Sequence, residues 1–330
     1  MPILNIYDNV PVFIHFVGGY ILAYGGLILN FIVMLFTYEK NLINENKEQR
    51  FITRVNCFTN MYYAVISLVV HPQIEIIHGT ILLRCHGLGR SIINPITRII
   101  LFGVYIYAYI MIFTIVSIGF QFRYNLLCKR ILLTTSQLGR YYFICFIYSI
   151  ISGIIYSLNF SPIVPLKFRN EVNLNETIWI NEEPFFWNHV LINNGNNIFL
   201  LLTIFLYFTL TVTSYGINIF FIVKMKMLIK SNKLRLSKKT LLLQKQFNTI
   251  LNVQSIAPIF VILLPILLGI ILVIAKIRIN GFGLFIILGL EAVPFVNGLS
   301  VIVLTKEYRL KKRCIKNTLT KTTTKVILTK

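Results

Sequence analysis

Few side chains in this sequence could do chemistry, and the most conspicuous of them stands in apolar surroundings. Glu291 is the only acidic residue of the apolar run Phe282–Thr305. A carboxylate inside a membrane-spanning helix costs about 2.5–3.5 kcal/mol on insertion scales, so it must face protein or water. We expect Glu291 either to contact a ligand inside a helix bundle or to pair with a polar side chain of a neighbouring helix.

A second set of candidate side chains consists of four possible metal ligands: His71, His78, Cys85 and His86. Zinc sites usually contain ligand pairs two to four residues apart, and this set is spaced more widely. Histidines in a loop near a membrane interface are the alternative, so we expect no metal and no cofactor. The HExxH, Walker, GxSxG and paired CxxC patterns of enzymes are also missing, and we expect no catalysis.

Composition places these residues in a membrane protein. The 330-residue chain is 56% hydrophobic, has a mean hydropathy of +0.74 and is only 13% charged, against about 25% for soluble domains. Its net charge of +21 could indicate a nucleic-acid partner. However, the basic residues stand in gaps between apolar runs, which is typical of a polytopic membrane protein and excludes the nucleic-acid interpretation.

Seven apolar runs predict an all-α bundle of seven membrane-spanning helices. The second run is the weakest because it contains several polar residues. Prolines inside the sixth and seventh runs, Pro258, Pro265 and Pro294, predict helix kinks. The runs are Val12–Tyr38, Val55–Ile77, Ile99–Phe122, Tyr141–Phe160, Ile198–Val223, Gln246–Ala275 and Phe282–Thr305.

The distribution of positive charge predicts the orientation. Alternate gaps and the C-terminal tail hold 25 of the Lys and Arg residues, and the N-terminus with the other gaps holds 7. The positive-inside rule then places the N-terminus outside and the C-terminus in the cytoplasm. Asn175 begins a glycosylation sequon in a loop assigned to the outside. The basic stretch Lys224–Lys239 becomes a cytoplasmic loop, with membrane lipids as one partner.

We expect two parts: a transmembrane domain, residues 1–310, and a basic, Thr/Lys-rich cytoplasmic tail, residues 311–330. Cys314 follows a basic run just after the last span, which suits palmitoylation; an unmodified thiol is the alternative. Arg123 and Tyr124 close the third span at the cytoplasmic face. Arg123 either holds a resting contact that activation releases or simply anchors the helix.

Two sequence blocks resemble nematode serpentine chemoreceptors of the Str superfamily, closest to classes h, i and d. The block Ser237–Pro265 resembles the basic loop and two-proline sixth helix of that family, and Pro294–Arg309 resembles its closing helix and K-x-Tyr-Arg signature. A shorter piece, Phe122–Lys129, resembles the end of the third helix. The chain departs from the rhodopsin-like pattern at Phe122, where an acidic residue would precede Arg123.

This resemblance implies a G-protein-coupled chemosensory receptor that binds a small-molecule cue, as in olfaction. It also implies a plasma-membrane location, in the cilia of sensory neurons. The third inner loop and adjacent helix ends would contact a heterotrimeric G protein, through Arg123, Tyr124, Lys230, Lys233, Arg235, Lys238 and Lys239.

Two other classes of membrane protein remain open from the residues alone. A secondary transporter usually shows paired repeats and charged or broken helices at the midplane; this chain has one buried acid and no repeat. A ligand-gated seven-helix channel of the insect odorant-receptor type would place its N-terminus in the cytoplasm, opposite to the charge prediction.

Overall fold

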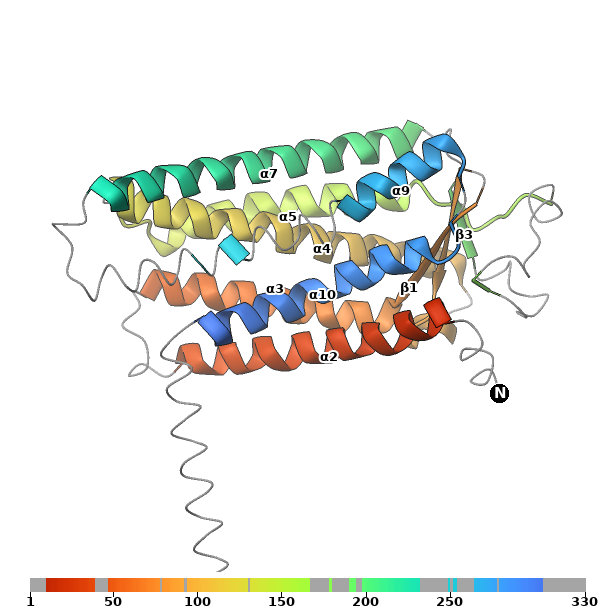
Figure 1. Cartoon of the computed structure of the whole chain (residues 1–330), viewed down its shortest axis with the longest axis horizontal. Helices are drawn as coiled ribbons and strands as arrows, with labels where there is room; N and C mark the ends of the chain where they lie inside the picture. Colours follow the sequence, from red (N-terminus) through yellow and green to blue (C-terminus); the bar gives the residue numbers. More distant parts are fainter. Residues whose placement is uncertain are drawn as a thin grey trace, which may run out of the picture.

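The structure is a computed structural model of the whole chain (Figure 1). It describes residues 10–38, 47–77, 79–91, 94–129, 131–166, 178–179, 190–193, 198–231, 249, 252–253, 264–277 and 279–304.

Helices make up most of the described residues, as the sequence predicts. Within the described ranges, five helices contain a stretch long and apolar enough to cross a membrane, and α9 is a shorter apolar helix. The remaining helix, α3, corresponds to the run predicted to be weakest. The bounds are α2 Val10–Tyr38, α3 Lys47–Val70, α4 Pro95–Tyr124, α5 Thr135–Ser157, α7 Ile198–Ser231, α9 Leu264–Ala275 and α10 Phe282–Leu304.

The predicted second span is wrong at its C-terminal end. Helix α3 stops at Val70, and the strand β1, Pro72–Ile77, takes the place of further helix. Pro72 has no N–H to donate, and its ring disfavours helical backbone at the preceding residue. β1 pairs antiparallel with β2, Thr80–Cys85, and β2 pairs with β3, Val190–Asn193. The sheet stands across the end of the bundle where α2 begins, here called the sheet end (Figure 1).

The sheet is held from both of its faces. On one face, the indole N–H of Trp179 donates to Gln73 Oε1 at 3.0 Å, and the backbone N–H of Ile178 donates to Glu75 Oε2 at 3.0 Å. On the side toward the helices, β1 contacts α9 and α10. A side chain at Gly283 of α10 would meet the carbonyl of Ile74, so strand and helix approach closely only because this residue is glycine.

Helices α2, α3 and α10 form one side of the bundle, and α4, α5 and α7 form the other (Figure 1). Glycines bring α2 and α10 together. A Cβ on Gly26 would lie 2.9 Å from Pro294 Cβ, and one on Gly298 would lie 2.8 Å from Leu29 Cβ. Small residues let transmembrane helices approach closely, and the contact area then stabilises the pair by van der Waals packing.

A buried chain of asparagines joins α2, α3 and α10 at mid-depth. Asn30 Nδ2 donates to Gly26 O at 2.7 Å and to Pro294 O at 2.8 Å. Asn60 Nδ2 donates to Asn30 Oδ1, and Asn297 Nδ2 donates to Asn60 Oδ1, each at 3.1 Å. Interhelical hydrogen bonds of this kind help to fix helix positions where there is no water to compete for them.

The opposite side of α2 is apolar and exposed. Ile14, Ile21, Ile28 and Leu35 follow one another at intervals of seven residues, and each is at least 50% exposed. A row of large exposed aliphatic side chains on a helix is unfavourable in water but suits contact with lipid. The structure thus agrees with a helix bundle that is surrounded by membrane.

Local capping signals explain where α4 and α5 begin. Asn94 Oδ1 accepts a hydrogen bond from the backbone N–H of Ile96 at 2.9 Å, and Pro95 occupies the first turn, where no N–H is needed. Thr134 and Gln137 form a reciprocal capping box at the start of α5. At its other end α4 runs into a short π-helix, Asn125–Lys129.

Candidate functional site

A cavity of about 540 Å³ lies beneath the sheet. Its walls come from all three strands and from α4, α5, α7, α9 and α10. Most of the lining is aliphatic or aromatic, with Phe102, Tyr105 and Ile106 on α4 and Ile287 and Leu290 on α10. The volume lies within the range of about 300–1,000 Å³ that is usual for small-molecule sites.

The strands contribute to the cavity through one face. Ile74 and Ile76 of β1 line it, as do Ile81 and Leu83 of β2. Successive side chains of a strand point to opposite faces, so residues two apart share one wall. β1, which the sequence predicts as the end of the second membrane span, therefore forms part of the outer wall of this cavity.

Asn193, at the end of β3, adds a polar group to this apolar wall. Its side chain lines the cavity, and the residue is 1% exposed. Neither its amide nitrogen nor its amide oxygen has a hydrogen-bond partner among the described residues. A buried amide without partners is unfavourable by about 1–3 kcal/mol, so a ligand that hydrogen-bonds to it gains specificity as well as affinity.

Tyrosine hydroxyls supply further polar groups at the cavity. The hydroxyl of Tyr63, on α3, donates to the hydroxyl of Tyr105 at 2.8 Å. The hydroxyl of Tyr148, on α5, donates to the carbonyl of Leu206, on α7, at 3.2 Å. The first bond joins α3 to α4 and the second joins α5 to α7, so a ligand that displaces the hydroxyl of Tyr105 or Tyr148 also changes how the helices are connected.

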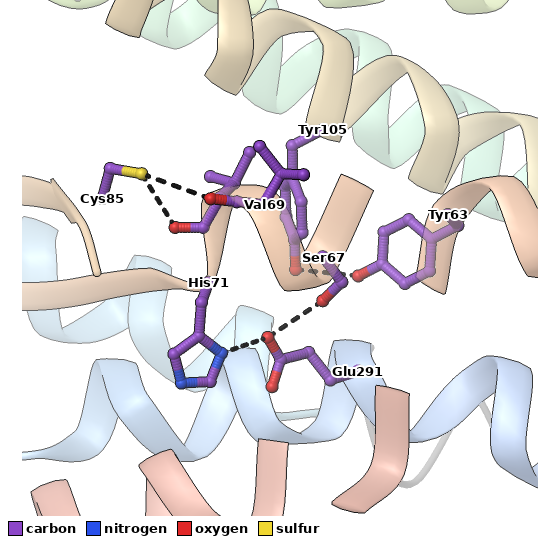
Figure 2. Close-up of polar contacts among 8 residues, drawn as sticks. Tyr63, Ser67, Val69, His71, Cys85, Tyr105 and Glu291 are labelled. Atoms are coloured by element: carbon purple, nitrogen blue, oxygen red, sulfur yellow. Dashed lines mark hydrogen bonds and ion pairs between the residues drawn. The ribbon is translucent and has the colours of Figure 1, made fainter. Parts of the chain in front are cut away.

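Glu291 is buried in the bundle, where the sequence predicts it. Its Oε1 accepts a hydrogen bond from Ser67 Oγ at 2.9 Å and lies 3.0 Å from His71 Nδ1 (Figure 2). Two neighbours thus satisfy one oxygen of the carboxylate. Glu291 is not among the residues that line the cavity, although the adjacent Leu290 is. The predicted direct contact with a ligand stays a prediction.

His71 has an unusual backbone conformation, with φ of 36°. Residues other than glycine rarely adopt positive φ, and when they do the strain often marks a functional position. Its backbone N–H donates to Ser67 O at 2.7 Å and so continues the last turn of α3. The chain then turns directly into Pro72, which lines the cavity.

Among the residues that the structure describes, the other metal ligands considered in the sequence do not gather around His71. Within the described residues, Cys85 and His86 do not form a ligand cluster with His71, and His78 lies outside those residues. The Cys85 thiol donates to the carbonyl of Val70 at 3.0 Å. Burial raises the pKa of this thiol to about 11, which keeps it protonated and unreactive at neutral pH.

Arg123 and Tyr124 lie at the far end of α4 from the sheet. The Tyr124 ring stacks on Phe221 of α7 with centroids 4.8 Å apart, and Lys129 Nζ lies 5.8 Å from the centre of the same ring. The end of α4 is thereby packed against α7, whose Met225 is buried against Phe120. The predicted coupling role of these residues remains a prediction.

The remaining predicted positions divide into two groups. Lys230 lies in the last turn of α7, Pro265 in the first turn of α9, and Pro294 inside α10. The others lie outside the described residues, and their roles stay predictions: Lys233, Arg235, Lys238, Lys239, Pro258, Asn175 and Cys314.

Two residues of this region were not predicted from the sequence as site residues. Asn193 stands in a polar loop stretch, Asn193-Asn194-Gly195-Asn196-Asn197, where one more asparagine attracts no attention. His15 lies in the first apolar run and is 1% exposed beside His71, with ring centroids 4.4 Å apart. The nearby Gly18-Gly19 pair was the signal for a close approach of α2 to another element.

Comparison with known proteins decides the class of this chain. The family described as "Serpentine type 7TM GPCR chemoreceptor Str" matches residues 17–311. The chain belongs to the Str family of serpentine chemoreceptors. This family is one of receptors rather than enzymes, and the receptor's apolar helices agree with a multi-pass membrane protein.

A solved structure supports the fold of the receptor. The receptor is similar to the crystal structure of squid rhodopsin, with a TM-score of 0.52 and 11% sequence identity. The match covers 89% of this chain and 81% of that chain. At this identity the likeness concerns the fold alone. No curated protein sequence matches the receptor.

Proposed function

We propose that the receptor binds a small, mainly apolar molecule in the cavity beneath the sheet and signals to a heterotrimeric G protein. The unpartnered amide of Asn193 in an otherwise apolar cavity is the observation that carries the ligand proposal. The preferred ligand has a hydrocarbon body and one group, such as a carbonyl or hydroxyl, that bonds to an amide. Glu291 then either influences the ligand through the residues of the cavity wall or contacts the ligand directly after the helices rearrange.

Basic residues at the end of the bundle away from the sheet support an outward-facing sheet. Lys47 and Arg50 begin α3, Arg140 lies in the first turns of α5, and Lys224 and Lys226 lie near the end of α7, all away from the sheet. Basic residues favour the cytoplasmic side. We therefore propose that the N-terminus and the Asn175 sequon lie outside, and the C-terminal tail with Cys314 inside.

In this orientation the packed ends of α4 and α7 face the cytoplasm. We assign the G-protein contact to Arg123, Tyr124 and the basic stretch that contains Lys230, Lys233, Arg235, Lys238 and Lys239. Ligand binding favours one of two helix arrangements and shifts their populations. The plasma membrane of sensory cilia is the proposed location.

Calcium imaging of cells that express the receptor with a G protein tests the ligand site. After a chemical panel identifies an agonist, Asn193→Leu is expected to reduce the response to polar agonists more than to their hydrocarbon analogues. Ile106→Trp fills the cavity and is expected to abolish the response. Its matched control is Ile21→Trp, at a position on the outer face of α2 that is 61% exposed.

Equal responses from Ile106→Trp, Ile21→Trp and the unaltered receptor, at equal surface expression, would refute the cavity as the ligand site. Uptake of a solute by proteoliposomes that contain the receptor alone would instead favour a transporter. Labelling of an N-terminal epitope on intact cells tests the orientation; labelling only after permeabilisation would contradict it.

A further inference from the structure

Three buried side chains from three elements meet at the sheet end, beside the cavity but not in its lining. They are His15 of α2, His71 at the junction of α3 and β1, and Glu291 of α10, and each is at most 2% exposed. One ring nitrogen of each histidine and one carboxylate oxygen all lie within 4.8 Å of one another. Together they make a set of two imidazoles and one carboxylate.

The known contacts of this triad leave polar atoms without protein partners. Among the described residues, His71 Nε2 and Glu291 Oε2 have no hydrogen-bond partner, although both are buried. The backbone of Pro72 lies near the His15 ring, but neither ring nitrogen of His15 makes a hydrogen bond of normal geometry within the described chain. Buried polar atoms are nearly always paired, so unpaired ones call for a further partner such as an ion or a water molecule.

The second oxygen of Glu291 and the second nitrogen of His71 both lie on the α2 side of the pair (Figure 2). Gly19 of α2 confirms this direction, because a Cβ there would meet Glu291 Oε2 and the His71 ring. His15 stands one turn before Gly19 on the same helix. The unsatisfied atoms thus point toward the helix that carries the third member of the triad.

The backbone of His71 also indicates a constrained position. Its φ of 36° places the imidazole between α2 and α10 at a cost in backbone energy. Ser67, one turn earlier in α3, donates to Glu291 Oε1 at 2.9 Å and orients the carboxylate. Hydrogen bonds to the ligating groups are the usual second layer of a metal site.

We propose that His15, His71 and Glu291 bind a divalent transition-metal ion, with zinc the best match. Two histidines and one glutamate are a known zinc ligand set that leaves a further coordination position open. Imidazole favours zinc, copper and nickel over calcium and magnesium, which prefer oxygen ligands. This assignment runs against the expectation from the sequence that the chain holds no metal, and it uses a different residue set.

The geometry needs a small adjustment to close around a metal. Bonds of about 2.0–2.1 Å place tetrahedral ligand atoms roughly 3.4 Å apart. One donor atom of each residue lies within 4.8 Å of the other two, so side-chain rotation has to bring the three donors closer together around the ion.

Metal binding would connect α2, α10 and the start of β1 through one ion. Since Pro72 follows His71 and lines the cavity, the metal also fixes part of the cavity wall. The zinc ion is then either a permanently bound structural ion or a reversible modulator of the neighbouring ligand site. The affinity of the receptor for free zinc distinguishes these two roles.

The test is direct metal binding by the purified full-length receptor in lipid nanodiscs. The receptor carries an epitope tag without histidines, is stripped with chelator and is equilibrated with buffered free Zn²⁺. Bound zinc is then measured by mass spectrometry, and Co²⁺ replaces zinc to give a visible absorption spectrum. We expect one zinc per receptor and a cobalt spectrum typical of nitrogen and oxygen ligands in four-coordinate geometry.

Variants assign the ligands. His15→Phe and Glu291→Gln conserve shape and are expected to weaken zinc binding at least about a hundredfold, and Ser67→Ala about ten- to a hundredfold. His86→Phe is the matched control, because its ring lies 6.2 Å from that of His71 but outside the triad. It should bind zinc as the unaltered receptor does.

The proposal is overturned if the folded, monodisperse receptor binds no zinc or cobalt, or if His15→Phe binds zinc as tightly as the unaltered receptor. Loss of binding in His86→Phe but not in His15→Phe would also overturn it. Neither measurement depends on an agonist or a G protein. A negative result therefore leaves the proposed receptor function standing.

Discussion

Substitution of Gly19 by alanine places a methyl group in the contact between α2 and the Glu291–His71 pair. The added Cβ would meet Glu291 Oε2 and the His71 ring, so these side chains must move. The matched substitution is Gly216→Ala on α7, where an added Cβ meets nothing within 4 Å. Both changes replace a helical glycine by alanine, and only one of them disturbs a buried contact.

The two substitutions are expected to change the free energy of unfolding in opposite directions. In a helix, alanine is more favourable than glycine by about 0.8–1.0 kcal/mol, and Gly216→Ala gains up to this amount. Gly19→Ala gains it too, but overpacking costs about 1–3 kcal/mol. If the carboxylate rotates away and one of its two partners, Ser67 or His71, is left buried without a bond, a further 1–3 kcal/mol or so is lost. With such a bond lost, the net effect is a destabilisation of about 1–5 kcal/mol.

Thermal unfolding in detergent, followed with a thiol-reactive fluorogenic dye, measures this difference. Cys57 and Cys85 are 3% and 4% exposed, so they react only when the bundle opens. At the scale of about 2–4 °C per kcal/mol for domains of 150–250 residues, Gly19→Ala lowers Tm by at least about 2 °C. Gly216→Ala leaves Tm unchanged or raises it.

A Tm for Gly19→Ala equal to or above that of Gly216→Ala would refute the reasoning. It would mean that α2 is not seated against α10 at this depth, or that the Glu291–His71 pair has room for another methyl group. The zinc site proposed above would then lose the close approach of α2 on which it depends.

Three further changes test other parts of the structure. Asn60→Leu leaves two buried asparagine partners without their bonds and should lower the unfolding free energy by about 2–6 kcal/mol. Asn56→Leu is the control and should cost little, because the Asn56 amide oxygen has no partner among the described residues. Burial raises the pKa of Cys85 from 9.0 to about 11, so the rate of its alkylation by iodoacetamide should keep rising from pH 9 to pH 11. The free energy of unfolding should fall over the same range, because the thiol of the unfolded chain loses its proton at lower pH than the thiol of the folded chain. Gly283→Ala should separate α10 from the sheet and lower agonist affinity, as measured by competition binding.

Each of these predictions has an opposing result. Equal Tm values for the two asparagine variants would contradict the hydrogen-bond chain. An alkylation rate for the Cys85 peptide that levels off near pH 9, as for an exposed thiol, would contradict its burial. Unchanged agonist affinity in Gly283→Ala would show that the position of the sheet on α10 does not shape the ligand site.

The helical architecture was largely predictable because lipid exposure leaves a strong mark on the sequence. Long apolar runs bounded by charge gave the first, third and seventh helices to within a few residues at most ends. α10 begins at Phe282, as predicted, and α4 extends the predicted Ile99–Phe122 to Pro95–Tyr124. The extension at Pro95 follows from its cap, Asn94, which hydropathy does not register.

The sheet was not predictable from hydropathy. Pro72–Ile77 and Thr80–Cys85 carry aliphatic side chains on the face that lines the cavity, and Gln73, Glu75 and Arg84 fall on the opposite face. A hydropathy average merges β1 with the apolar helix before it, whereas Pro72 and the alternation of Gln73 and Glu75 with Ile74 and Ile76 are the signals of a strand. The tertiary contacts that bury it come from residues about 100 positions away, at Ile178 and Trp179.

The site was predictable only where chemistry contrasts with its surroundings. Glu291 stands out because a carboxylate is costly in an apolar helix. His15 does not, because an imidazole can be neutral and one histidine in a helix is unremarkable. That it lies beside His71 depends on the glycines that bring α2 close, and this proximity is a property of three elements together.

A wall made of strands separates two requirements that a purely helical pocket would combine. Main-chain hydrogen bonds hold β1 to β2, and they are indifferent to the side chains that the strands carry. Exchanges at Ile74, Ile76, Ile81 and Leu83 therefore alter the width and polarity of the chamber while the ladder and the interhelical packing persist. If the cavity is the ligand site proposed above, these four positions set the ligand selectivity without rebuilding the rest of the protein.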